Sequence, residues 1–167
     1  LGALCVTELL QRTEIDPEAV DELIFGCVGQ PSDAANVARV ISLLAGIPKS
    51  KRAYTVSRNC ASGLEAVMSA AEKISVGQVE TVIAGGAESM SNAPLLFSKD
   101  AANLFLRLQR ARSLSDKLGI LMQFRPRHFA PQSAIQMALT DPSCGLNMGQ
   151  TAEVLAKKFA ISRQRQD

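Results

Sequence analysis

The chain of 167 residues has no tryptophan, one tyrosine and a single histidine, and aromatic residues make up 4% of it. A surface on which nucleic-acid bases stack requires aromatic side chains, and this sequence has few of them. The net charge of +2 is also too small to indicate strong attraction to a polyanion. The composition therefore argues against a nucleic-acid-binding protein.

Metal-binding patterns are absent as well. The four cysteines stand far apart, at positions 5, 27, 60 and 144, and no Cys-x-x-Cys pair occurs. One histidine cannot complete a usual zinc site with this spacing, so we expect no metal. Scattered cysteines in a chain of this size fit reduced thiols, which favours the cytoplasm, or the mitochondrial matrix if the source is a eukaryote.

Long apolar runs and nucleotide-binding motifs are missing too. No apolar stretch reaches the length of a transmembrane helix, and no signal peptide opens the chain. Neither G-x-G-x-x-G nor a Walker A pattern occurs, which argues against a dinucleotide site and a P-loop. We expect a globular chain without a tightly bound cofactor.

The sequence does contain a repeating order of helices and strands. Hydrophobic residues make up 47% of the chain and charged residues 20%, as in ordinary globular domains. The spacing of apolar residues predicts helices over 1–12, 34–45 and 61–76 and strands over 23–28, 53–56 and 80–86. This order predicts an α/β fold, with helices covering a mostly parallel, mixed sheet. The apolar faces expected to pack are Leu1, Leu4, Cys5 and Leu9 in the first helix, and Leu64, Val67, Met68, Ala71 and Ile74 in the third.

The pattern changes between Glu88 and Leu146. Strand alternation stops, prolines recur, and seven positive against four negative side chains give this segment a charge of +3. The rest of the chain then totals −1, so this segment is the basic part of the protein. We therefore divide the sequence into an α/β core (1–87), an inserted loop domain (88–146) and a return to the core (147–167).

Cys60 occupies the most informative position. Residues 56–63, Val-Ser-Arg-Asn-Cys-Ala-Ser-Gly, connect a predicted strand to a predicted helix, which either Asn59 or Ser62 can cap. Ser62 and Glu65 also have capping-box spacing. The N–H groups and dipole of a helix start favour an anion, and a thiolate is a nucleophile. Cys60 is therefore either a nucleophile or, as is usual for a free cysteine, a small buried residue.

Four motifs, in matching order and spacing, resemble those of the thiolases, enzymes that make or cleave 3-ketoacyl-CoA. They are Asn-Cys-Ala-Ser-Gly (59–63), Ala-Gly-Gly-Ala-Glu-Ser-Met-Ser (84–91), Asn-Met-Gly-Gln-Thr-Ala-Glu (147–153), and Ile-Ser-Arg followed by Gln-Asp (161–167). The set spans nearly the whole chain. By this resemblance the chain is similar to the N-terminal half of a thiolase without its first strand and its second half.

The resemblance implies a function. Cys60 would be the nucleophile of a 3-ketoacyl-CoA thiolase, an acyltransferase of fatty acid β-oxidation, and would hold the acyl group as a thioester. Coenzyme A would be a substrate. Asn147 and Met148 would bind the acyl-CoA. Many thiolases have histidine at the position of Asn147. The alternative for Met148 is that it is an ordinary core methionine. The family's catalytic histidine and second cysteine would lie outside this chain, so we expect the chain alone to be inactive.

The resemblance assigns no catalytic role to His128 or to the other cysteines. His128 lies in the loop segment, and Cys5, Cys27 and Cys144 are expected to pack in the core. The basic side chains of the loop domain suit the phosphates of CoA, an acidic partner subunit or plain solvation.

Thiolases assemble, so the resemblance also implies a homodimer or tetramer, with a β-oxidation partner subunit as a further possibility. The biosynthetic acetyl-CoA acetyltransferase reaction is one alternative function. A condensing enzyme that uses acyl carrier protein is another, and the Gly-Gly-Ala-Glu-Ser-Met-Ser motif argues against it. A non-catalytic thiolase-like protein that binds CoA or lipid is a third, and the intact cysteine motif argues against that.

Overall fold

The computed structural model describes all 167 residues, which form two compact units, Leu1–Asn92 and Ala93–Asp167. The first unit holds the sheet and Cys60. From the sequence we predicted that the core ends at residue 87. We also predicted that residues 147–167 return to that core, and this remains a prediction. No helix is both long and apolar enough to cross a membrane.

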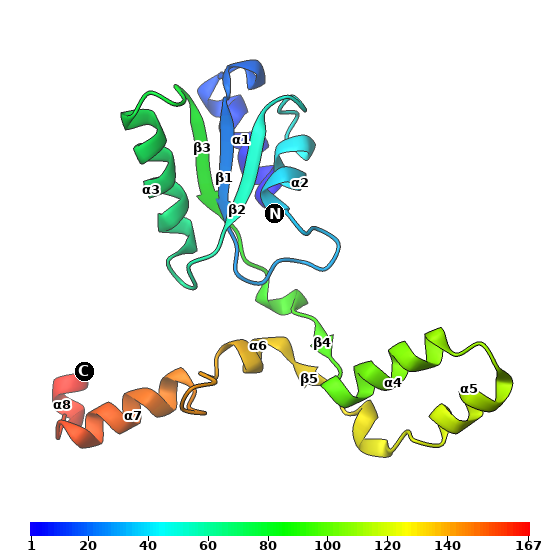
Figure 1. Cartoon of the computed structure of the whole chain (residues 1–167). Coiled ribbons are helices and arrows are strands. Elements are labelled where there is room, and N and C mark those ends of the chain that lie inside the picture. The colour runs from blue at the N-terminus through cyan, green and yellow to red at the C-terminus, as the bar shows by residue number, and fades with distance from the viewer. The chain divides into compact units, whose positions relative to one another are not determined.

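Three parallel strands form the sheet of the first unit, in the order β2-β1-β3 (Figure 1). They are β1 (Glu22–Gly26), β2 (Arg52–Val56) and β3 (Val82–Gly86). Gly26, the last residue of β1, lies opposite Val56 on one side and Gly86 on the other. All three carboxyl ends therefore meet at one edge of the sheet, where ligands of α/β proteins usually bind.

Helices cover both faces of this sheet: α1 (Gly2–Thr13) and α2 (Val37–Leu44) one face, α3 (Ser62–Ser75) the other (Figure 1). A short 3₁₀ turn, η1 (Pro17–Ala19), precedes β1. The central strand alternates between the two layers, since Leu23 and Phe25 pack with α1 and α2 while Ile24 packs with Ala66 and Ala70 of α3. The predicted α/β fold with a parallel sheet is confirmed.

The buried face of α1 is not the one that the sequence predicted. Val6 and Leu10 are buried, whereas Leu4 and Leu9 are exposed. The reason is Gly2, which lies so close to α2 that an added Cβ would stand 2.5 Å from Cδ1 of Ile41. The face of α1 that begins at Gly2 can therefore approach α2 closely. This face is buried, although the opposite face carries more leucine residues.

The apolar face predicted for α3 is likewise exposed. Ala66 and Ala70 pack against the sheet, while Leu64 is 63% exposed and Val67 is 50% exposed. The helix thus has one small-residue face that packs inside this unit and one large apolar face that this unit does not cover. A soluble protein rarely leaves such a patch open.

We expect the chain to self-associate or to depend on a partner chain, because burial of this α3 face would remove apolar surface from water. Light scattering should show masses above the monomer. The double variant Val67→Lys/Met68→Lys should reduce association, whereas Glu72→Lys, which makes the same charge change at an exposed position of the same helix, should not. A stable wild-type monomer would contradict this expectation.

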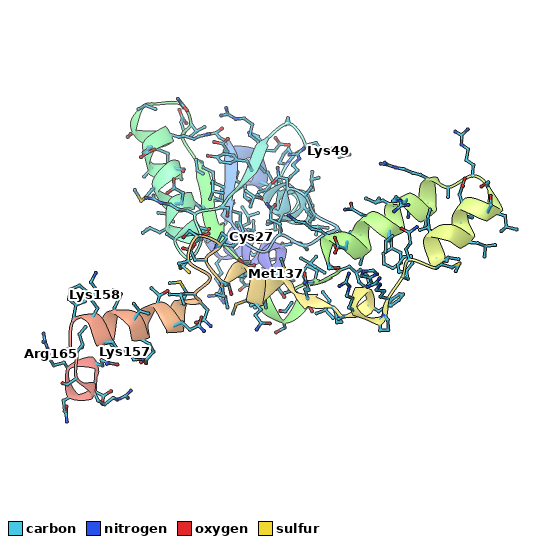
Figure 2. The ribbon with its side chains drawn as sticks, turned by 60° about the horizontal axis from the view of Figure 1, so that its bottom comes forward. Cys27, Lys49, Met137, Lys157, Lys158 and Arg165 are labelled. Carbon is cyan, nitrogen blue, oxygen red and sulfur yellow. The ribbon has the colours of Figure 1, made fainter.

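The second unit contains short elements. They are β4 (Leu95–Leu96), α4 (Lys99–Arg110), α5 (Leu114–Leu121), η3 (Pro126–Phe129), β5 (Gln132–Ser133), α6 (Ala134–Ala138), α7 (Met148–Lys158) and α8 (Arg163–Gln166). Strands β4 and β5 pair antiparallel. The basic side chains of Lys157, Lys158 and Arg165 project from the last turn of α7 and from α8 (Figure 2).

Aromatic rings hold α4 to the turn that follows α5. The ring of Phe124 lies 5.0 Å from Phe105, 5.5 Å from Phe129 and 6.1 Å from His128. Ser98 and Ser113 cap the two helices through their hydroxyl groups. The spacing of Leu104, Leu108 and Ala111 predicts a helix here, and α4 confirms it. Helix α5 was not predicted, although its Ser113 cap was a local signal for it.

Candidate active site

Cys60 lies in the turn between β2 and α3, at the carboxyl edge of the sheet, and its side chain is exposed. A single β-bridge joins Arg58 and Cys60 within this turn. The alternative of a small buried cysteine is therefore wrong for Cys60 in this structure. Its role as a nucleophile remains a prediction, and the position leaves the thiol accessible to a substrate.

Hydrogen bonds fix the turn, although not those expected. The Ser62 hydroxyl accepts from the backbone N–H of Arg58 at 2.8 Å and donates to the backbone oxygen of Asn59 at 2.6 Å. Asn59 itself adopts a left-handed conformation with a φ of 49°. The guanidinium of Arg58 pairs with Glu65 at 2.6 Å.

The prediction that Asn59 or Ser62 caps α3 is therefore wrong. The N-cap residue is Ala61, and no side chain accepts a hydrogen bond from the start of the helix. The Ser62 hydroxyl is used inside the turn, and Glu65 is used by Arg58, so the capping box does not form. No side chain accepts from the first N–H groups of α3, and the N–H of Ser62 donates to the backbone oxygen of Asn59 at 3.1 Å.

Glycines let this turn approach the sheet, and the sequence analysis missed the central one. A Cβ added at Gly26 would lie 2.5 Å from the backbone oxygen of Ser62 and 2.7 Å from the nitrogen of Gly63. A Cβ added at Gly86 would lie 3.2 Å from the Gly26 oxygen and 3.3 Å from Cα of Gly63. The glycine pair at the end of β3 permits either close packing or an unusual turn, and the structure shows close packing. The available signal for Gly26 was a glycine at the end of a buried strand.

Glu88 orders the loop that follows β1 at the same edge. Its carboxylate accepts from the backbone N–H groups of Val28 at 2.8 Å and Gly29 at 3.0 Å. The Cys27 thiol lies 3.8 Å from the same carboxylate. Burial, and then the charge of Glu88, raise the pKa of Cys27 above its ordinary value. Cys27 is therefore a protonated, packed thiol and a poor nucleophile at neutral pH.

The other predicted residues lie in the second unit. Asn147 caps α7, and its side chain forms a reciprocal capping box with Gln150, as the three-residue spacing of these two residues predicts. Met148 is 71% exposed, so the core alternative for it is wrong in this structure. The expected packing of Cys5 and Cys144 is also wrong, because both are exposed.

We expect limiting iodoacetamide to alkylate Cys60 first, because it combines exposure with a position at a helix start. Cys27 should react last, since it is buried with a raised pKa. Trypsin separates the four cysteines into different peptides, so peptide mapping gives the order directly. In Cys60→Ser, label should shift to Cys5 and Cys144 and not to Cys27. Preferential labelling of Cys27 or Cys144 in the wild-type chain would contradict the assignment.

Comparison with known proteins supports the resemblance over the whole chain. A family described as "Thiolase, N-terminal domain" matches residues 1–167. The 3-ketoacyl-CoA thiolase of Aeromonas salmonicida is 44% identical over 100% of this chain, and that of Colwellia psychrerythraea is 43% identical over the same span. The chain spans 38% of the length of each of these relatives.

Solved structures agree. The acetyl-CoA acetyltransferase of Bacillus anthracis is 34% identical with a TM-score of 0.74, over 95% of this chain and 35% of that one. The Acat5 thiolase of Ascaris suum in complex with coenzyme A is 28% identical with a TM-score of 0.76, over 98% of this chain and 37% of that one. The chain belongs to the thiolase family, and it corresponds to the N-terminal domain of these enzymes.

Proposed function

We propose that Cys60 is the nucleophile of a 3-ketoacyl-CoA thiolase. Its thiolate attacks the 3-keto carbon, the bond between C2 and C3 breaks, and acetyl-CoA leaves as an enolate that takes up a proton. The acyl group stays on Cys60 as a thioester. The thiol of coenzyme A, losing its proton to a base, then attacks this thioester, which releases an acyl-CoA shorter by two carbons and restores the Cys60 thiolate.

The observation that carries this proposal is the exposed thiol in a rigid turn at the carboxyl edge of the sheet. Of the four cysteines, only Cys60 both lies at this edge of the sheet and is exposed. Hydrogen bonds of Ser62 fix the backbone on both sides of it. A nucleophile held in one conformation loses little entropy when the substrate arrives.

The substrate assignment has separate support. The relatives are named 3-ketoacyl-CoA thiolase, and the Ascaris suum structure contains coenzyme A. We propose that the exposed residues Met148 and Asn147 contact the acyl-CoA. Coenzyme A acts here as a substrate, and the reaction uses no tightly bound cofactor. Fatty acid β-oxidation in the cytoplasm, in a homodimer or tetramer, is the setting we propose; four unpaired thiols agree with a reducing compartment.

The biosynthetic direction uses the same steps in reverse. Acetyl-CoA would acylate Cys60, and the enolate of a second acyl-CoA would then attack the thioester. The acetyl-CoA acetyltransferase of Bacillus anthracis, at 34% identity, is the observation that favours this second candidate. The same nucleophile serves the degradative and the biosynthetic direction. The concentrations of acyl-CoA and free CoA therefore set the direction in which the reaction proceeds.

The test is to capture the acyl group. A chimera in which residues 1–167 replace the matching segment of the Aeromonas salmonicida thiolase is mixed with acetoacetyl-CoA without free CoA, digested and examined by mass spectrometry. We expect acetyl on the peptide that contains Cys60, and none in the Cys60→Ser chimera. Cys144→Ser is the matched control and should keep the adduct. An adduct on another cysteine, or none from a folded chimera that consumes substrate, would refute the proposal.

A further inference from the structure

Glu88 joins the ends of two neighbouring strands at the carboxyl edge of the sheet. Its carboxylate accepts from the backbone N–H groups of Val28 at 2.8 Å and Gly29 at 3.0 Å, and the thiol of Cys27 lies 3.8 Å from one of its oxygens. Three consecutive residues after β1 are thus bound to a residue that follows β3 and lies 59 to 61 positions away in the sequence. Hydrogen bonds from N–H groups to a carboxylate are roughly twice as strong as those between neutral groups.

This carboxylate extends the connection between β1 and β3 beyond their backbone pairing (Figure 1). The last backbone bond between the two segments runs from the N–H of Ala87 to the oxygen of Gly26, at 3.1 Å. Glu88, the next residue, continues the connection through its side chain. Gly29 permits the close contact, because a Cβ added there would lie 3.0 Å from Oε1 of Glu88. A side chain at this position would therefore crowd the carboxylate.

The two strand ends that Glu88 joins also contact the start of α3. A Cβ added at Gly26 would stand 2.5 Å from the backbone oxygen of Ser62, so the end of β1 lies directly against this turn. A Cβ added at Gly86 would stand 3.3 Å from Cα of Gly63, so the end of β3 lies against it as well. The position of the first turn of α3 therefore depends on both strand ends.

Ser62 transmits this position to Cys60. Its buried hydroxyl accepts from the backbone N–H of Arg58 and donates to the backbone oxygen of Asn59, the two residues that precede Cys60. A displacement of Ser62 therefore displaces the backbone that carries the thiol. The side chain of Glu88 forms its hydrogen bonds with residues 27–29 and none with this turn. Its effect on Cys60 thus passes through the strand ends.

We propose that Glu88 is a positioning residue for the thiolase reaction, because its carboxylate holds the ends of β1 and β3 together and thereby fixes the place of the Cys60 thiol. This inference rests on the proposed role of Cys60 as the nucleophile. Glu88→Gln keeps the size of the side chain but replaces one acceptor oxygen by an amino group, which cannot accept from Val28 or Gly29. One backbone N–H group then turns to water, and the strand ends separate more easily.

The chimera with the Aeromonas salmonicida thiolase provides the test. In its Glu88→Gln variant we expect kcat for cleavage of acetoacetyl-CoA to fall about tenfold, since a catalytic group has to be held within about 0.5 Å. KM should change by less than about twofold, because the reacting thiol moves while substrate binding is kept. Glu72→Gln, at an exposed position of α3, is the matched control and should keep both values. Circular dichroism gives the folded fraction. A variant that melts at a lower temperature but keeps the kcat of each folded molecule would overturn the proposal.

Gly29→Ala tests the same contact from its other side. The added methyl group would lie 3.0 Å from Oε1 of Glu88, so it should displace the carboxylate and also lower kcat. Because both changes act on one contact, the double variant Gly29→Ala/Glu88→Gln should be no slower than the slower of the two single variants. Losses that multiply in the double variant would contradict a shared route.

The acetyl adduct on Cys60 separates this inference from the proposed function. If the unsubstituted chimera forms no adduct on Cys60, both are refuted. If the adduct forms and Glu88→Gln leaves kcat unchanged, only the positioning role of Glu88 is refuted. An adduct together with a lowered kcat, an unchanged KM and a wild-type rate for Glu72→Gln is the expected result.

Discussion

The chimera that carries residues 1–167 in an otherwise complete thiolase should cleave acetoacetyl-CoA, whereas the 167-residue chain alone should show no measurable turnover. Cleavage needs a base for the thiol and an acid for the leaving enolate, each worth roughly 10²–10⁴-fold in rate. The unit that holds Cys60 contains no histidine, and the one histidine of the chain is buried in the second unit with Nδ1 already bonded. The unit that carries the proposed nucleophile thus supplies no histidine for these proton transfers.

Loss of the keto-thioester absorbance, with CoA present, measures this turnover. Cys60→Ala should lower the rate of the chimera by a factor of about 10⁴ or more, because the covalent route is lost. His128→Ala and Cys144→Ala should retain most of the rate. Turnover by the isolated chain that disappears in Cys60→Ala would show that the partners lie within these 167 residues, and His128→Ala of that chain would then be the next variant to measure.

Substituting Gly26 should displace Cys60 without changing the chemistry of its thiol. In Gly26→Ala the new methyl group would stand 2.5 Å from the oxygen of Ser62 and 2.7 Å from the nitrogen of Gly63. These are backbone atoms at the start of α3, so no side-chain rotation relieves the clash. Overpacking of this kind costs about 1–3 kcal/mol, and we expect the upper end because β1 is the central strand. A shift of α3 that moves Cys60 by about 1 Å should slow the chimera about 100-fold.

Gly63→Ala is the matched control, since it lies in the same contact but its added Cβ meets nothing within 4 Å. It should leave the free energy of unfolding unchanged or raise it slightly. Denaturant unfolding followed by circular dichroism measures both variants, and the alkylation rate of Cys60 reports its displacement. Gly26→Ala with the stability and the Cys60 reactivity of the wild type would show that the close approach is not required.

Local patterns in the sequence determined much of the first unit. Strands β1, β2 and β3 and helices α1 and α3 lie within a few residues of their predicted positions, because apolar periodicity and chain-breaking residues act over short distances. The same reasoning placed Cys60 between a strand and a helix. It also identified the Asn147 cap, since a capping box joins residues three positions apart.

Only the tertiary structure decided which face of each helix is buried. Helix α3 has a large apolar stripe and a small one formed by Ala66 and Ala70, and periodicity favours the larger. The small stripe packs on the sheet because close approach of backbones requires small side chains, as Gly2 shows for α1. The partners of Glu88 were decided in the same way, because its carboxylate accepts from the backbone N–H groups of Val28 and Gly29, which lie 60 and 59 residues away in the sequence. Such contacts depend on where distant segments meet, and sequence spacing carries no information about those distances.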